Sequence, residues 1–271
     1  MFDLYDMLFE VSNDVRHRIM MHLREGPSTV TNVSQRLSIS LTEASRHFNR
    51  LSQAGLIRKR PEGDYSITLM GKTILSQIEP LSFVVKHNQY FQEHDATGIP
   101  TQFLNRIHEL RDAEANYTRS ANIMRLVEKI ASIPVEAEEF SYCILDESSM
   151  ELVLYSEQDE DDEKTESIVE TITSGVDSRA LFPSSLDKSR IPPESLEAFH
   201  DLHKLGNFEF RIIDSVELFL YMNEKYSIIS FPDRGHKFDY LGFEATDQRA
   251  LTWCRDVFEY YWRRSKPFLA H

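Results

Sequence analysis

The sequence contains little cysteine and no long apolar run. Only Cys143 and Cys254 are present among 271 residues, and they stand far apart. Their number and spacing exclude a disulfide framework and a paired-thiol zinc site, and they favour buried apolar cysteines over a redox pair. No run of about eighteen apolar residues occurs, and the first residues lack a basic segment, so we expect neither a transmembrane helix nor a signal peptide. These absences predict a soluble, cytoplasmic protein with no membrane partner.

Acidic residues are unevenly distributed along the chain. The formal net charge is −14, yet residues 1–80 carry 10 basic and 9 acidic side chains, against 20 and 35 in residues 81–271. Within 46–60 there are five basic residues and none that is acidic. The acidity therefore belongs to the later part of the chain, and one surface near the N-terminus is locally basic, as a nucleic-acid contact requires.

The first seventy residues have the pattern of a winged helix-turn-helix domain. Apolar residues recur at helical spacing in three segments, and two short strand-like runs then flank a turn. Ser40 and Glu43 have the spacing of a capping box at the start of the third helix. The predicted helices cover about 13–24, 30–38 and 41–54, and the predicted strands cover 56–60 and 65–68.

The third helix is expected to enter the major groove of DNA. With Ala44, Phe48 and Leu51 facing inward, its outward side chains mix donors and acceptors, as base edges require. Arg46 can pair with guanine and Asn49 with adenine, while the basic residues after them suit phosphates. The full predicted DNA-binding set is Thr42, Glu43, Ser45, Arg46, Asn49, Arg50, Arg58, Lys59 and Arg60. The alternatives are a merely solvated basic helix face and a winged helix that contacts another protein.

Helical periodicity continues beyond the wing. Pro80 is expected to break or kink the helix that starts at Leu69. Helical segments are predicted at about 81–94, 101–112 and 117–132, and apolar residues spaced by 4, 3 and 4 suit a partner helix. We expect the helices near 4–24 and 69–94 to build a homodimer.

From about residue 136 the pattern changes to short strands separated by helices, which is typical of an α/β domain. The predicted fold class is therefore α+β or α/β, with a winged helix-turn-helix domain at 1–80, a helical linker and dimerisation region at 81–135, and an α/β regulatory domain at 136–271. Strands are predicted at 140–145, 152–155, 180–182, 208–213, 218–222 and 227–231, and helices at 168–176, 194–205 and 247–264.

Several segments together resemble a known family. Residues 41–58 and 65–71 are similar to the ArsR-type winged helices of archaeal regulators, and the likeness continues through 90–100, 110–114 and 253–262. The chain thus resembles archaeal regulators that join such a winged helix to a methanogenesis regulatory protein middle domain, the methyltransferase-specific regulators of methanogens among them.

This resemblance implies a cytoplasmic transcription factor acting on genes of methanogenic metabolism, and it supplies no known ligand. ArsR-type metal sensors use cysteine thiolates on a helix of the winged-helix domain, and residues 1–80 contain no cysteine. We therefore expect no metal site of that kind, and no cofactor.

The acidic domain offers few candidate site residues. It resembles phospholipase D-like sensor domains but lacks the His-x-Lys-x4-Asp motif of the enzymes. Arg179 and Arg211 can bind a small anionic metabolite if their strands are neighbours, or they can simply pair with surface carboxylates. His200 and His203 are more consistent with a solvated helix face than with a metal site. The acidic run at 157–163 fits an exposed loop, and the aromatic residues of the last helix fit the core.

The sequence therefore predicts a homodimeric, sequence-specific DNA-binding transcriptional regulator that is not an enzyme. Its partner is double-stranded DNA, and its second domain senses a signal or assembles subunits. Two alternatives remain: a protein–protein adaptor, and an enzyme with a winged-helix appendage, for which we find no convergent catalytic constellation.

Overall fold

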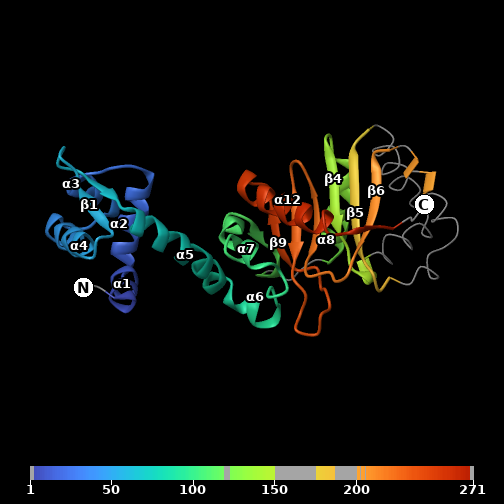
Figure 1. Cartoon of the computed structure of the whole chain (residues 1–271), viewed down its shortest axis with the longest axis horizontal. Helices are drawn as coiled ribbons and strands as arrows, with labels where there is room; N and C mark the ends of the chain where they lie inside the picture. The colour runs from blue at the N-terminus through green and yellow to red at the C-terminus, as the bar shows by residue number, and fades with distance from the viewer. Residues whose placement is uncertain are drawn as a thin grey trace. The chain divides into compact units, whose positions relative to one another are not determined.

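The computed structural model describes residues 3–118, 123–149, 175–186 and 200–268, apart from 202 and 205. It divides the chain into two compact units, Met1–Ser82 and Phe83–His271. Figure 1 labels elements of both units where there is room. Within the described residues, no helix combines the length and the apolar character that crossing a membrane would need.

The first unit is a winged helix-turn-helix domain, as predicted. Its hairpin strands pair antiparallel, with Gly63 at a φ of 90° in the tip, a conformation that favours glycine. The elements are α1 (Leu4–Val11), α2 (Asp14–Glu25), α3 (Val30–Leu37), α4 (Leu41–Gln53), β1 (Ile57–Lys59), β2 (Tyr65–Ile67) and α5 (Leu69–Lys86), which runs on into the second unit.

Local sequence explains where these helices begin. The side chains of Asn13, Thr29 and Ser40 each accept a hydrogen bond from a first-turn amide of the helix that follows. The cap of α2 is Asn13, and the preceding residue, Ser12, caps the end of α1. Helices α2 and α4 then bury apolar stripes in one shared core, to which Phe48 contributes a fully buried ring.

Helix α5 does not end at Pro80, contrary to one reading of the sequence. It continues from Leu69 to Lys86 with Pro80 inside it. Proline removes a single backbone N–H, and the turns on either side keep their own hydrogen bonds. The interruption comes only at His87, after which α6 (Asn88–Glu93) begins.

The second unit is built on a mixed sheet, which confirms the predicted α/β class. The eight strands that the described residues contribute lie in the order β10-β6-β5-β4-β7-β8-β9-β3, with β4, β5 and β6 parallel to each other. The strands are β3 (Glu114–Ala115), β4 (Phe140–Ile144), β5 (Asp177–Pro183), β6 (Phe208–Ile213), β7 (Phe219–Asn223), β8 (Ser227–Ser230), β9 (Gly242–Ala245) and β10 (Lys266–Pro267).

Helices cover both faces of this sheet. Along β4 the side chains alternate: Tyr142 joins the core shared with α12 (Gln248–Trp262), and Cys143 joins the core shared with α8 (Ile123–Val135). Tyr142 stacks on Phe258, with ring centroids 4.6 Å apart. The aromatic residues of α12 are therefore core, as predicted, with Trp253 fully buried.

Some predicted elements differ from those observed. The helix expected at 101–112 is divided into α7 (Thr101–Leu104) and a 3₁₀ turn at Ile107–Leu110, because Arg106 takes non-helical backbone angles. Strands β3, β9 and β10 were not predicted; β3 and β10, with two residues each, are too short for a period-two signal. The elements expected at 152–155 and most of those expected at 168–176 and 194–205 lie outside the described residues.

The linker and dimerisation region expected at 81–135 falls in the second unit from Phe83 onward. Phe83 and Tyr90 pack in the same core as α12 and the sheet. A dimerisation role for this region stays a prediction.

Candidate nucleic-acid interface

Helix α4 is held rigidly by its cap and its buried face. The Ser40 hydroxyl accepts a hydrogen bond from the Glu43 amide at 3.1 Å, which is the first half of the predicted capping box. The Glu43 carboxylate itself lies 3.7 Å from Nε2 of His47. His47 is buried beside Phe48, a position that the apolar stripe alone did not reveal. Burial and the charges of Arg16 and Arg46 lower the pKa of His47, which favours its neutral form.

The outward side of α4 carries the predicted base-reading residues. Thr42, Arg46 and Asn49 are exposed, while Glu43 and Ser45 are half-buried. Among the described residues, neither Arg46 nor Asn49 has a side-chain hydrogen bond or an ion pair. A guanidinium and a carboxamide one turn apart are thus free to meet an outside partner with bidentate geometry.

The wing offers one free cation beside two that are engaged. Lys59 is exposed, and its ammonium group has no ion pair in the described part of the chain. The Arg58 Nε atom lies 3.4 Å from the Ser66 hydroxyl, and Arg60 pairs with Glu62 and Asp64 across the hairpin tip at 3.3 and 3.4 Å. Of the three wing cations, Lys59 is best suited to a phosphate.

Arg50 occupies a different place from the other predicted phosphate contacts. Its guanidinium makes two hydrogen bonds to the Glu10 carboxylate on α1, Nη2–Oε1 at 2.5 Å and Nε–Oε2 at 3.1 Å. Glu10 also lies 3.1 Å from Nε of the buried Arg16. Sequence reasoning missed this cluster because its members are up to 40 residues apart and share no motif.

The two arginines singled out in the second unit do lie on neighbouring strands. Arg179 of β5 and Arg211 of β6 both approach the Trp262 ring, with guanidinium carbons 5.4 and 4.4 Å from its centroid. Carboxylates already engage both: Asp177 and Glu259 with Arg179, and Glu209 with Arg211. These contacts favour the alternative in which the arginines pair with carboxylates and tie α12 to the sheet.

Other side chains singled out in the acidic domain have structural surroundings. Cys143 and Cys254 are buried, and burial raises the pKa of both thiols to about 12. The ring of His203 contacts the Phe208 carbonyl oxygen, while His200 is exposed. Among the residues that the structure describes, no cluster of three metal-ligating side chains occurs. The acidic run at 157–163 lies outside them.

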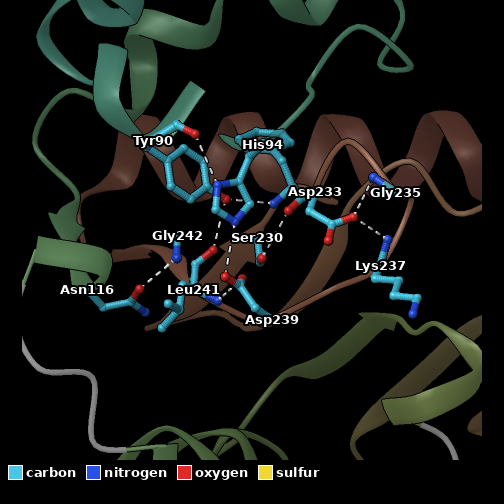
Figure 2. A network of polar contacts seen from close by, with 11 residues as sticks. Tyr90, His94, Asn116, Ser230, Asp233, Gly235, Lys237, Asp239, Leu241 and Gly242 are labelled. Atoms are coloured by element: carbon cyan, nitrogen blue, oxygen red, sulfur yellow. Dashed lines mark hydrogen bonds and ion pairs between the residues drawn. The ribbon is translucent and has the colours of Figure 1, made fainter. Parts of the chain in front are cut away.

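A buried polar network joins α6 to the segment between β8 and β9 (Figure 2). The Tyr90 hydroxyl donates to the Leu241 carbonyl and accepts from the Phe231 amide, at 2.8 and 3.0 Å. His94 stacks on Tyr90 with ring centroids 3.9 Å apart and pairs with Asp239. Because these partners are backbone groups and a single carboxylate, the network anchors a segment and resembles no catalytic site.

Comparison with known families agrees with this description. Residues 11–60 match the model of a helix-turn-helix domain, and residues 163–264 match that of the methanogenesis regulatory protein FilR1, middle domain. No curated protein matches the chain. The two matches confirm the predicted resemblance, and they support a DNA-binding transcriptional regulator in place of an enzyme.

Solved structures give only distant likenesses. TrmBL2, an archaeal chromatin protein, is 14% identical with a TM-score of 0.40, and the match covers 98% of this chain and 100% of that one. The phospholipase D family member Nuc from Salmonella typhimurium is 9% identical with a TM-score of 0.36, over 56% of this chain and 92% of that one.

Proposed function

We propose that this chain, which joins a helix-turn-helix domain to a methanogenesis regulatory protein middle domain, is a homodimeric transcription factor that reads double-stranded DNA with α4. In this proposal it acts in the cytoplasm of an archaeon on genes of methanogenic metabolism. The second unit regulates when the first binds DNA, through a signal or through subunit assembly.

The exposed pair Arg46 and Asn49 is the observation that supports DNA reading most strongly. Both project from a capped helix whose opposite face is buried in the core, so their positions are fixed before binding. A preformed helix spares the cost of ordering the backbone on binding. An adaptor that contacts another protein would have no need for two unpaired bidentate groups at helical spacing.

Charge distribution supports confining DNA contact to the first unit. Residues 81–271 carry 35 acidic and 20 basic side chains, and phosphates repel such a surface. The first unit is nearly neutral, and Arg46 of α4 and Lys59 of the wing are exposed cations without an ion pair among the described residues. We therefore place the contact within about residues 29–65.

Selection from a random duplex library tests this function. The full chain is incubated with the library at physiological salt, and the retained duplexes are sequenced. We expect a pseudo-palindrome whose half-sites are about one helical turn apart, because a two-fold dimer presents two copies of α4. Retention without sequence preference, or no retention at all, would favour the adaptor alternative.

Helix α1 supports the homodimer because its apolar side faces solvent and its buried side carries a charged residue, the reverse of an ordinary surface helix. It turns large apolar side chains to solvent while it buries the carboxylate of Glu10. Exposed apolar patches of this kind mark contact surfaces. We propose a second copy of the chain as the partner, with the exposed apolar residues of α5 contributing. The exposed set is Leu4, Tyr5, Leu8 and Phe9 on α1 and Leu69, Met70, Leu81, Val84 and Val85 on α5.

Sedimentation equilibrium of the full chain at micromolar concentration tests the dimer. We expect the mass of two chains for the wild type and of one chain for the double variant Tyr5→Glu, Leu8→Glu. Dimerisation of this variant would bury the two new glutamate carboxylates in the interface and remove their hydration. Gln35→Glu, which adds a charge at an exposed position of α3, is the control and should leave the dimer intact. A monomeric wild-type chain would contradict the proposal.

A further inference from the structure

Three charged side chains join α1 to the reading helix. The Glu10 carboxylate accepts a two-bond fork from Arg50 of α4 and lies within 3.1 Å of Arg16 of α2. Arg16 also donates to the carbonyl oxygens of Phe9 and Glu10, at 3.0 and 2.5 Å, and so satisfies the C-terminal end of α1. One carboxylate thus connects three helices of the first unit.

Glu10 and Arg16 of this network are buried, and only Arg50 is exposed to solvent. Glu10 and Arg16 are each 5% exposed, whereas the Arg50 side chain is 43% exposed. The hydrogen bonds from Arg50 hold the pKa of Glu10 below its ordinary value, so the carboxylate is ionised at neutral pH. A buried carboxylate that lost its fork would be left short of partners, which is costly.

We infer that Glu10 and Arg50 are positioning residues. They set the rotation of α4 about its own axis and thereby the direction in which Arg46 and Asn49 project. Arg50 stands one helical turn after Arg46, so its fork to Glu10 fixes the helix beside the reading side chains. The Arg50 guanidinium already binds the Glu10 carboxylate, whereas an arginine that contacts a DNA phosphate needs a free guanidinium. This inference rests on the proposed function.

The two roles for Arg50 differ in what substitutions do. Arg50→Lys keeps the charge but loses the planar fork. Glu10→Gln removes a negative charge near DNA, which on electrostatic grounds alone would raise the affinity. A positioning role predicts that both substitutions lower the affinity for the preferred duplex, while a phosphate contact predicts little change for Arg50→Lys.

The experiment measures binding of full-length variants to a duplex enriched by the wild type and to a shuffled duplex, over a range of salt. We expect Glu10→Gln and Arg50→Lys each to lose at least about fivefold for the enriched duplex, the equivalent of one weakened base contact. For the shuffled duplex, Arg50→Lys should keep the wild-type affinity and salt slope, and Glu10→Gln should bind no more weakly than the wild type. The double variant should be little worse than either single one, because both break the same interaction.

Glu25→Gln is the matched control, since it removes a carboxylate from an exposed ion pair with Arg36. It should not lower the affinity. Thermal unfolding confirms that each variant is folded at the binding temperature, and Arg50→Lys, a change at a partly exposed site, keeps the test valid if Glu10→Gln does not fold.

Wild-type affinity in Arg50→Lys, or a gain of affinity in a folded Glu10→Gln, would overturn the inference while leaving the proposed function standing. If the wild type itself prefers no sequence, the proposed function fails first, and the inference fails with it.

Discussion

The Nε2 atom of His94 lies 3.2 Å from the Oδ2 atom of Asp239, and its Nδ1 atom lies 3.0 Å from the Tyr90 carbonyl oxygen. An ionised carboxylate and a carbonyl oxygen only accept hydrogen bonds, so both ring nitrogens must donate. Burial on its own would lower the pKa of His94, but the hydrogen bonds to Asp239 and Tyr90 outweigh it and raise the pKa. The folded protein therefore favours the imidazolium form of His94, whose contacts are drawn in Figure 2.

This arrangement predicts a pH dependence of stability. A pKa raised in the folded state gives stability that is fully present below the unfolded pKa of about 6.5 and is lost as the pH rises through the folded value. The melting temperature of the wild type should therefore fall relative to that of His94→Gln as the pH rises from about 6 to 8.5. Parallel pH profiles for the two proteins would contradict the assignment.

His87 should behave in the opposite sense. Burial lowers its pKa to about 4, and its Nδ1 atom contacts the Tyr117 hydroxyl. A depressed histidine pKa means that the unfolded chain takes up the proton first, so stability is lost as the pH falls from about 6.5 towards 4. Side-chain NMR titration should find His87 neutral at pH 6 and His94 protonated. The same charge state for both would refute this contrast.

Lys59→Ala should weaken DNA binding uniformly. Lys59 is a wing cation with neither an ion pair nor a side-chain hydrogen bond in the described part of the chain, so its loss should remove one phosphate contact and no base contact. Affinity should fall alike on preferred and shuffled duplexes, and the salt slope should decrease by about one. The control is Lys72→Ala, which removes an exposed cation of α5. An unchanged slope for Lys59→Ala would exclude the wing contact.

Ser40→Ala should loosen the reading helix. It removes the hydrogen bond to the Glu43 amide, and such caps contribute about 1 kcal/mol. Hydrogen exchange of the first-turn amides of α4 should accelerate by about fivefold. Thr73→Ala is the control, because the Thr73 hydroxyl only bonds back to the Leu69 carbonyl within α5. Equal exchange in the Ser40 variant and the wild type would show that the cap does not hold α4.

Gly71→Ala should destabilise the connection between the wing and α5. A Cβ atom at Gly71 would lie 2.3 Å from the Leu56 carbonyl oxygen, so backbone must move, at a cost of about 1–3 kcal/mol. Gly26→Ala, with nothing within 4 Å of the added atom, is the control and should be close to neutral. Denaturant unfolding followed by circular dichroism distinguishes them, and equal midpoints would contradict this packing.

Much of the first unit could be predicted from the sequence because its signals are local. The apolar spacing of Ala44, Phe48 and Leu51 and the Ser40 cap define α4 within a single segment. The same residues leave Arg46 and Asn49 on the outer side. A helix that is amphipathic over thirteen residues needs no long-range information to be found.

What could not be predicted depends on contacts between distant segments. Nothing near Arg50 in the sequence indicates that Glu10 engages it. A surface helix ordinarily buries apolar side chains, whereas α1 buries the Glu10 carboxylate. Arg179 and Arg211 were expected to be neighbours only if β5 and β6 paired, and the carboxylates around them appear only in the folded sheet. Tertiary ion pairs of this kind leave no periodic trace.

The central claim, that α4 reads base pairs, is tested most directly by the base preference of Arg46→Ala and Asn49→Ala. Each variant is measured against every single-base change of the enriched duplex. We predict that each loses discrimination at one base pair of each half-site, by about 1–3 kcal/mol, and keeps it at the others. Unchanged affinity and unchanged preference in both variants would contradict the account.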